Sequence, residues 1–512
     1  MNCTRRDFLK WIATGAAILS LGGGTLADAA KPNIVLIMVD DMGFSDIGCY
    51  GGEIPTPHID ALAAGGLCFT HFYNAARCSP TRAALLTGLY NHRGYLNDHC
   101  VTIAEVLQTA GYFTIQTGKW HVGDKLPQWP AQRGFDRSYT VPQGGGFYFK
   151  PIPDRFIVEG DTILYREGGA EPPPGWYSTD AFADYGIKYI GEALTEKKPF
   201  FLYLAFNAPH WPLQAPPEDI AKFRGQYRKG WDRLREERHA RQIEMGIVDK
   251  KWPLTPRDAQ VKAWDALSEA EKNEQDERMA IYAAVVNRMD RAVGHVVDYL
   301  KQQGAYENTL ILFLSDNGGC NEGGVHGSNA KPGVPGTHES QVFYGSSWAN
   351  ASNTPFRLYK KWVHEGGIAT PLIAHWPAVI QDGGKLTGEV GHVIDLMATC
   401  ADVGGAEYPK TLKGKEIPPL EGLSLAPIFR AGKREGHDAI FWAHAGNYAL
   451  RSGKWKLVFK AGGQWELYDI EADRTELHDL AAQFPDKVKA LAAKWEAWAE
   501  RTEVKPYPAK PR

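Results

Sequence analysis

The segment Asn33-Ile-Val-Leu-Ile-Met-Val39 is followed directly by Asp40-Asp41-Met42-Gly43. Six consecutive apolar residues without polar alternation are typical of a strand that is covered on both faces, as in a parallel sheet. The two aspartates then lie where a parallel strand ends. In open α/β sheets the active site lies outside the carboxyl ends of the strands. The segment therefore predicts both a fold class and the position of a functional site.

Three further apolar runs, 112–117, 200–206 and 309–314, also end in reactive residues, which include Lys119, His121, His210 and Asp316. Helical patterns at 102–110, 180–194 and 279–300 separate the runs, and the last of them carries one apolar stripe. The charged stretch 218–275 is typical of a solvated helical excursion. We therefore expect an α/β fold with a large mixed, mainly parallel sheet that is flanked by helices.

The pattern changes after about residue 435. Short strand-like segments at 439–445, 448–451, 455–459 and 465–469 follow one another closely, and an amphipathic helix is expected at about 485–500. This predicts a C-terminal subdomain, 436–512, with a four-stranded antiparallel sheet and a helix. The catalytic domain would then span residues 30–435.

Residues 1–29 have the pattern of an export signal. Thr4-Arg5-Arg6-Asp7-Phe8-Leu9-Lys10 precedes an apolar stretch that is too short to span a bilayer, and the small-residue site Ala27-Asp28-Ala29 follows. The paired arginines favour a twin-arginine signal peptide over an ordinary secretory signal or an uncleaved anchor. We therefore expect that the twin-arginine machinery exports this protein, and that the protein is located in a bacterial periplasm or is secreted.

Composition narrows the function class. The chain has 512 residues, and its 57 Lys+Arg against 60 Asp+Glu give a net charge of −3, which argues against a nucleic-acid binder. The cysteines match no CxxC zinc pattern, and their disulfide connectivity cannot be deduced.

Hard oxygen ligands are expected at two strand ends. Asp40 and Asp41 end one strand, and Asp316 and Asn317 end another. Neighbouring parallel strands would bring the four side chains together, and such a set suits Ca²⁺ or Mg²⁺ better than zinc. Taken singly, each pair could equally be a turn or a helix cap.

A candidate nucleophile lies in Cys78-Ser79-Pro80-Thr81-Arg82-Ala83-Ala84-Leu85-Leu86-Thr87-Gly88. Pro80 suits the first turn of a helix, so Cys78 would sit at a helix N-terminus, which attracts anions. Arg82 would follow one turn later. A small buried cysteine without a function is the alternative interpretation.

This segment resembles in full the sulfatase signature Cys-x-Pro-x-Arg-x-x-x-x-Thr-Gly. Gly118-Lys119-Trp120-His121, Asn207-Ala208-Pro209-His210, Ser315-Asp316-Asn317-Gly318 and the segment Thr354–Lys360 follow in the order of that family. The chain thus resembles the arylsulfatase-type branch of the alkaline phosphatase superfamily over about residues 32–500. It departs from many relatives at 93–99, which is shorter, so the resemblance does not define the rim of the pocket there.

The resemblance implies that Cys78 is converted by a formylglycine-generating enzyme to an aldehyde, whose hydrate supplies the attacking hydroxyl. One Ca²⁺ per chain would be bound by Asp40, Asp41, Asp316 and Asn317, with residue 78 and the sulfate completing its shell. Arg82 and Lys119 would stabilise the hydrate and the sulfate. His121 would act as a base, and His210, beside Lys360, would protonate the leaving oxygen.

The expected substrate is a sulfated carbohydrate, with activity on aryl sulfates. His338, Glu339, Trp348 and Asn353, in the loop 318–354, are candidates for substrate contacts. A phosphate or phosphonate monoester hydrolase and a non-catalytic glycan-binding protein remain as alternatives, because fold alone does not fix function.

Overall fold

The computed structural model describes residues 31–90 and 94–504. The expected signal peptide, 1–29, lies outside the described residues. Within the described part of the chain, no helix is both long and apolar enough to cross a membrane.

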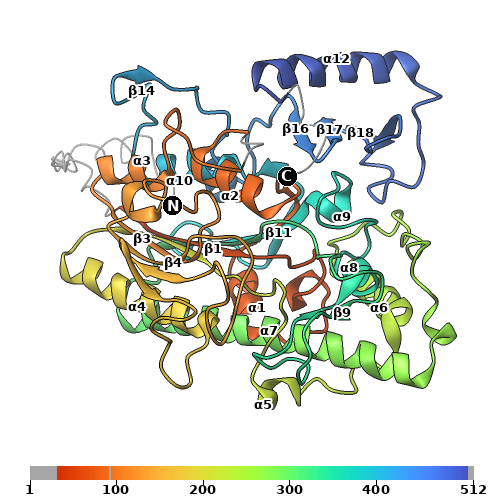
Figure 1. The fold of residues 1–512 in the computed structure, drawn as a ribbon. Helices are drawn as coiled ribbons and strands as arrows, with labels where there is room; N and C mark the ends of the chain where they lie inside the picture. The colour runs from red at the N-terminus through yellow and green to blue at the C-terminus, as the bar shows by residue number, and fades with distance from the viewer. Residues whose placement is uncertain (1–30, 91–93, 505–512) are drawn as a thin grey trace, which may run out of the picture. The chain divides into compact units, whose positions relative to one another are not determined.

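A mixed sheet of eleven strands forms the centre of the fold within these residues (Figure 1). Its middle strands, β8-β1-β7-β3-β4, are all parallel, whereas antiparallel pairs occur toward both edges. In spatial order the strands are β12 (Lys385–Thr387), β2 (Leu67–Tyr73), β11 (Ala369–His375), β8 (Thr309–Ser315), β1 (Asn33–Val39), β7 (Phe200–Ala205), β3 (Phe113–Lys119), β4 (Arg137–Val141), β5 (Ile157–Glu159) and β6 (Thr162–Tyr165), with β13 (Gly391–His392) paired to β2. The predicted mainly parallel sheet is confirmed.

Helices cover both faces of this sheet (Figure 1). One face carries α1 (Pro57–Ala64), α4 (Ser178–Thr195) and α7 (Glu269–Gln302), and the other carries α2 (Cys78–Thr87), α3 (Ile103–Thr109), α10 (Asp395–Gly404) and α11 (Ala426–Ala431). Along β1, Val35 and Ile37 join the core of the first face, whereas Leu36 and Met38 join that of the second. Both faces of β1 are therefore buried, which explains why its apolar residues do not alternate with polar ones.

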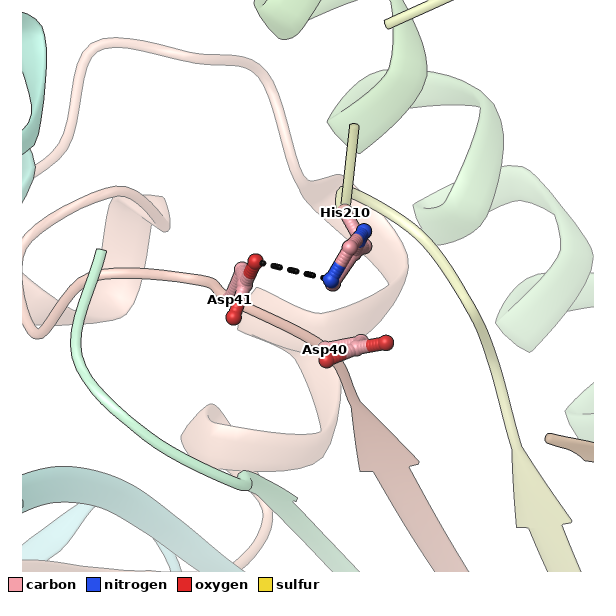
Figure 2. Close-up of side chains that lie close together, drawn as sticks. All are labelled: Asp40, Asp41 and His210. Carbon is pink, nitrogen blue, oxygen red and sulfur yellow. Dashed lines mark ion pairs between the residues drawn. The ribbon is translucent and has the colours of Figure 1, made fainter. Parts of the chain in front are cut away.

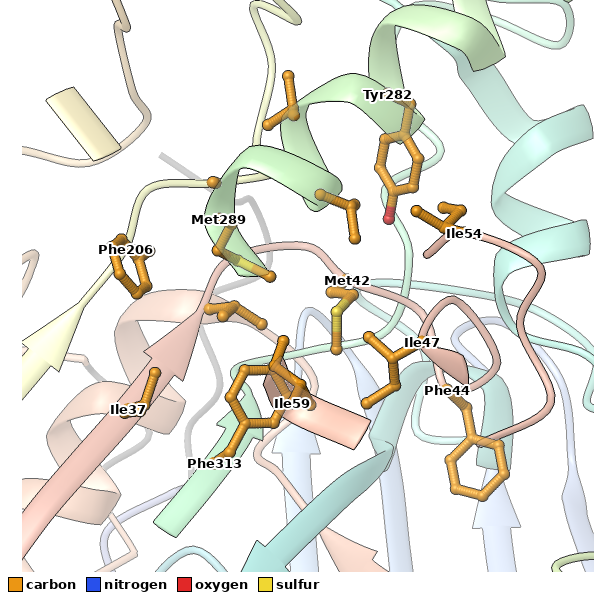
Figure 3. Close-up of a cluster of buried hydrophobic side chains, with 14 of the residues drawn as sticks. Ile37, Met42, Phe44, Ile47, Ile54, Ile59, Phe206, Tyr282, Met289 and Phe313 are labelled. Carbon is orange, nitrogen blue, oxygen red and sulfur yellow. The ribbon is translucent and has the colours of Figure 1, made fainter. Parts of the chain in front are cut away.

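The long helix α7 packs on the sheet through the predicted stripe. Ser268 and Glu271 form a capping box at its start, as expected from the sequence. In Figure 3, Tyr282 and Met289 extend from α7 toward a cluster of buried side chains that includes Phe313 of β8. Both are at most 1 % exposed, so the stripe is part of the core.

Shorter elements connect these layers. The charged stretch that was predicted as a helical excursion contains α6 (Gly230–Glu244) and the start of α7, with a long loop between them. The remaining short elements are α5 (Pro217–Ile220), α6 (Gly230–Glu244), α8 (Gly345–Ser352), α9 (Glu365–Ile368), β9 (Ser328–Asn329), β10 (Val342–Phe343), β14 (Thr411–Leu412), β15 (Lys415–Glu416), and the 3₁₀ turns Gly48–Tyr50, Pro130–Gln132 and Trp264–Ala266.

The C-terminal residues form the expected antiparallel sheet, β16 (Ile440–His444), β17 (Asn447–Ser452), β18 (Trp455–Phe459) and β19 (Trp465–Asp469), followed by α12 (Pro485–Arg501). One face of this sheet packs on Trp495 and Trp498 of α12. Its other face, with Trp442 and Val458, joins the core of the large sheet. The described residues from Pro32 onward form one compact unit, and the boundary at residue 435 stays a prediction.

The parallel strands all end at one edge of the large sheet. The register pairs Val39 of β1 with Ser315 of β8, so Asp40 and Asp316 follow neighbouring strand ends. Lys119 is the last residue of β3. The reactive residues that were predicted at strand ends therefore meet at one edge of the sheet.

Candidate functional site

Four oxygen-bearing side chains meet where β1 and β8 end. Asp40, Asp41, Asp316 and Asn317 are all at most 1 % exposed. The main-chain N–H of Asp41 donates to Oδ1 of Asp316 at 3.3 Å, and the amide of Asn317 donates to Oδ1 of Asp41 at 2.7 Å. The two pairs that were predicted as metal ligands therefore form one cluster.

Cys78 is the first residue of α2, as predicted, and is 3 % exposed. Arg77 before it is extended, so the helix begins at the candidate nucleophile. One turn later, Arg82 donates from Nε and Nη2 to Oδ2 of Asp316 at 3.0 and 2.8 Å, and from Nη1 to the main-chain carbonyl of Lys119 at 3.1 Å. Arg82 thus links α2, which begins at the candidate nucleophile, to the ends of β8 and β3.

Two lysines lie among the carboxylates, and both are at most 1 % exposed. Lys119 donates from Nζ to Asp40. Lys360 lies 2.8 Å from Oδ1 of Asp41 and 3.5 Å from Nε2 of His210. Figure 2 shows the ring of His210 directed at Asp41, with Nε2 3.5 Å from Oδ2. Each of the two aspartates that follow β1 therefore has its own ammonium group.

The main chain fixes the tautomer of His210. Its Nδ1 lies 2.5 Å from the carbonyl oxygen of Trp211. A carbonyl only accepts, so Nδ1 carries the proton and Nε2 of the neutral ring is an acceptor. Burial lowers the pKa of His210, although Asp41 opposes the effect. The neutral ring thus presents a lone pair within reach of the ammonium group of Lys360.

His121 has a left-handed backbone, with φ 59°, two residues after the end of β3. Its Nδ1 is buried without a hydrogen-bond partner among the described residues. Burial, together with Lys119, holds the pKa of His121 well below its usual value. A Cβ added to Gly144 would lie 2.2 Å from Nε2 of His121, so only glycine leaves room for the ring. His121 is therefore a neutral imidazole in a fixed position.

Four of these side chains, Cys78, His121, His210 and Lys360, line a cleft of about 470 Å³. Arg82, Lys119 and the four oxygen-bearing side chains are buried and are not among its lining residues. Besides these candidate catalytic residues, the lining carries further charged groups, which include Arg77 and Arg155. We call these two residues the wall arginines.

Charge balance sets the ionisation of the cluster. Burial alone would raise the pKa of Asp40, but Lys119 and the neighbouring cations hold it below its usual range. Burial and the charge of Asp40 raise the pKa of Asp316 to about 7 despite Arg82. Burial raises the pKa of Cys78, which keeps its thiol protonated. An unmodified Cys78 is therefore a poor nucleophile, because the thiolate is the reactive form.

The donor set fits a hard divalent cation. Oδ1 of Asp40 and Oδ1 of Asn317 are buried acceptors without a donor among the described residues. One ligand atom from each of Asp40, Asp316 and Cys78 lies within 4.8 Å of the others. A second such group contains His210, but the ammonium of Lys360 already supplies positive charge there. Carboxylate and amide oxygens suit Ca²⁺ or Mg²⁺.

Two of the four residues of the loop 318–354 that were expected to contact substrate are core residues. Trp348 is fully buried beside Trp231 and Trp264, so it is a core residue. Asn353 is also fully buried, and its side chain bonds the main chain of Gly319. His338 and Glu339 do not line the cleft. These four residues were candidates for substrate contacts.

Other lining residues had not been predicted. Arg155, Trp211 and Glu322 all line the cleft, and Trp211 donates from Nε1 to Glu322. The run Gly144-Gly145-Gly146 was the available signal for the segment with Arg155, because glycines mark close approaches of the main chain.

Comparisons with known proteins agree with this geometry. The Sulfatase family model matches residues 32–406, and the model of the C-terminal region of N-sulphoglucosamine sulphohydrolase matches residues 356–500. An uncharacterized sulfatase of Schizosaccharomyces pombe is 34 % identical over 93 % of this chain and 95 % of its own length. An arylsulfatase of Klebsiella aerogenes is 34 % identical over 83 % of this chain and 98 % of its own.

Among solved structures, Ps i-CgsB in complex with k-i-k-neocarrahexaose is 28 % identical with a TM-score of 0.67, covering 92 % of this chain and 93 % of the other. The family match spans most of the chain, from the first strand to beyond the cleft-lining residues. The chain therefore belongs to the sulfatase family, whose enzymes hydrolyse sulfate esters.

Proposed function

We propose that this protein hydrolyses sulfate monoesters of carbohydrates outside the cytoplasm, with activity on aryl sulfates, by means of a formylglycine made from Cys78. The observation that carries the proposal is the buried group of Arg82, Lys119 and Lys360 around the first residue of α2. Three buried cations and a helix N-terminus around residue 78, which lines the cleft, are suited to an oxyanion. The raised pKa of the Cys78 thiol supports conversion to another nucleophile.

One Ca²⁺ would be held by Asp40, Asp41, Asp316 and Asn317, with residue 78 at its edge. When bound, this ion would polarise the sulfate and help to keep the nucleophile oriented. Arg82 would stabilise the nucleophile and the sulfate through its charge, because all three of its side-chain nitrogens already donate to Asp316 or to the carbonyl of Lys119.

Proton transfer falls to the two histidines. His121 is neutral and has an unpaired Nδ1, which suits it to accept a proton near residue 78. The neutral His210 presents Nε2 to Lys360 at 3.5 Å. We propose that the proton for the leaving oxygen comes from Lys360, either directly or through His210. The expected general acid is thus a pair of residues and not a single histidine.

The substrate class is argued from relatives and from the signal segment. One relative is named an arylsulfatase, and one solved relative holds a neocarrahexaose. A polymer or oligosaccharide suits an enzyme that the twin-arginine machinery exports after the formylglycine-generating enzyme has acted. Aryl sulfates would then serve as small surrogates.

The test combines the mass of residue 78 with turnover. Trypsin cleaves after Arg77 and releases Cys78–Arg82, whose mass distinguishes the aldehyde from the thiol. We expect the aldehyde, and we expect sulfate release from 4-nitrophenyl sulfate that Cys78→Ala abolishes. An unmodified thiol in active enzyme would contradict the formylglycine. Faster turnover of a matched phenyl phosphate or phenylphosphonate ester would contradict the assignment of sulfate.

A further inference from the structure

Two arginines on the walls of the cleft have no part in the proposed reaction. Arg77 directly precedes the nucleophile, and Arg155 lies on the loop after β4. Both are partly buried. Within residues 31–90 and 94–504, neither guanidinium has a carboxylate oxygen within the 4.0 Å of an ion pair, whereas Arg82 is paired with Asp316 at 2.8 Å.

Arg155 is held in place by the main chain. Its Nε donates to the carbonyl of Gly144 at 2.5 Å. A Cβ added to Gly145 would lie 2.8 Å from Cζ of Arg155, and one added to Gly144 would meet the ring of His121. The main chain of Gly144 thus lies between the guanidinium group of Arg155 and the imidazole ring of His121. Its two Nη groups remain available to a ligand.

Acidic residues on the same cleft do not neutralise this pair. Glu322 is engaged by Nε1 of Trp211 and lies 3.5 Å from Nζ of Lys361. Asp124 and Asp154 are exposed, so water screens their charges. Burial lowers the pKa of Arg155 even though Asp154 opposes the effect. Arg155 is therefore a partly desolvated cation without a counter-ion.

We infer that Arg77 and Arg155 form a second anion subsite, which binds a carboxylate or an additional sulfate on the sugar that carries the scissile ester. This rests on the proposed function. The charge of the scissile sulfate is met by Lys360, which lines the cleft, and by the fully buried Arg82 and Lys119, so Arg77 and Arg155 serve a different anion. Guanidinium groups match planar or multi-oxygen anions through two parallel hydrogen bonds.

The test uses two aryl esters that differ by one charge, 3-carboxyphenyl sulfate and 3-carbamoylphenyl sulfate. Arg77→Gln and Arg155→Gln should each lower the ratio of their kcat/KM values about tenfold, the size of one charge-assisted hydrogen bond. Arg155→Lys should recover part of the ratio. The matched control is Arg233→Gln, which removes a charge from an exposed helix position and should leave the ratio unchanged.

A binding arm separates this inference from the proposed function. In Cys78→Ala protein, calorimetry compares glucosamine 2-N,6-O-disulfate with N-acetylglucosamine 6-sulfate, and both arginine variants should weaken only the disulfated sugar. If the wild type cleaves neither aryl ester, the proposed function fails and the binding arm alone decides. An unchanged ratio and unchanged binding would overturn the subsite. An equal loss on both esters would also overturn it, because Arg155 would then merely position Gly144.

Discussion

Replacement of Glu365 by glutamine should destabilise the whole molecule, because this carboxylate joins the two sheets. Glu365 begins α9 and is fully buried. Its Oε1 lies 2.7 Å from Nζ of Lys456, on β18, and its Oε2 lies 3.0 Å from Nε of Arg474. The hydroxyl of Tyr73, on β2, donates to Oε2 at 3.2 Å. Glutamine keeps the shape but removes the charge.

The magnitude follows from the ionisation of this group. Burial alone would raise the pKa of Glu365, but Lys456 and Arg474 outweigh burial and lower it from 4.5 to about 2. A shift of this size corresponds to roughly 3 kcal/mol of stability. Breaking a buried ion pair from one side costs about 3–5 kcal/mol, which agrees. Because the folded pKa is depressed, this contribution is present above pH 4.5 and is lost as the pH falls toward 2.

Urea unfolding, followed by tryptophan fluorescence, measures the effect. We expect Glu365→Gln to lose about 3 kcal/mol at pH 7 and about 2 kcal/mol at pH 3.5, because the wild type has by then lost part of its own advantage. The control is Glu236→Gln, whose partner Arg233 is 63 % exposed at the side chain, and its loss should stay within about 1 kcal/mol. Equal stability of Glu365→Gln and the wild type at pH 7 would refute the reasoning.

Three further outcomes are expected. Cys78→Ser should release at most one equivalent of phenol per chain from an aryl sulfate and retain the sulfate, since serine has a single hydroxyl on that carbon; sustained turnover, measured with intact protein mass, would contradict this. Gly144→Ala should lower kcat at least about tenfold with little change in KM, because its Cβ would displace the ring of His121; unchanged kcat would show that the ring has room. Elemental analysis should find about one Ca²⁺ per chain, and EDTA should lower the thermal midpoint, because Asp40 and Asp316 would then repel each other; zinc without calcium would contradict the donor set.

The parts of the site that could be predicted are those that local sequence encodes. A buried parallel strand must be apolar throughout, so the polar residues after Val39 and Leu314 mark the strand ends without further information. Cys78 could be placed at a helix start because Pro80 is tolerated only in the first turn. The meeting of Asp40 with Asp316 then followed from the common edge of parallel strands.

What escaped prediction depends on packing between distant segments. Trp348 lies in a loop-like, glycine-rich stretch, yet Trp231 and Trp264 from the excursion enclose it. Arg155 enters the cleft only because the loop after β4 folds back against Gly144. Neither contact produces a periodic pattern in the sequence. The sequence therefore could not indicate that Trp348 is buried or that Arg155 lines the cleft.

Charge also indicates which ester the buried cluster of aspartates and cations suits. Asp40, Asp41 and Asp316 face Arg82, Lys119 and Lys360, so the protein groups alone sum to zero when all are ionised. A bound divalent cation brings the sum to +2. A sulfate monoester carries one negative charge, and an ionised nucleophile adds a second, so the cluster with its cation balances that transition state. A phosphate monoester dianion would leave one negative charge uncompensated in a buried site, which is costly. Arg77 and Arg155 are not part of this charge balance. Their charges select among sulfated substrates and do not discriminate between sulfate and phosphate esters.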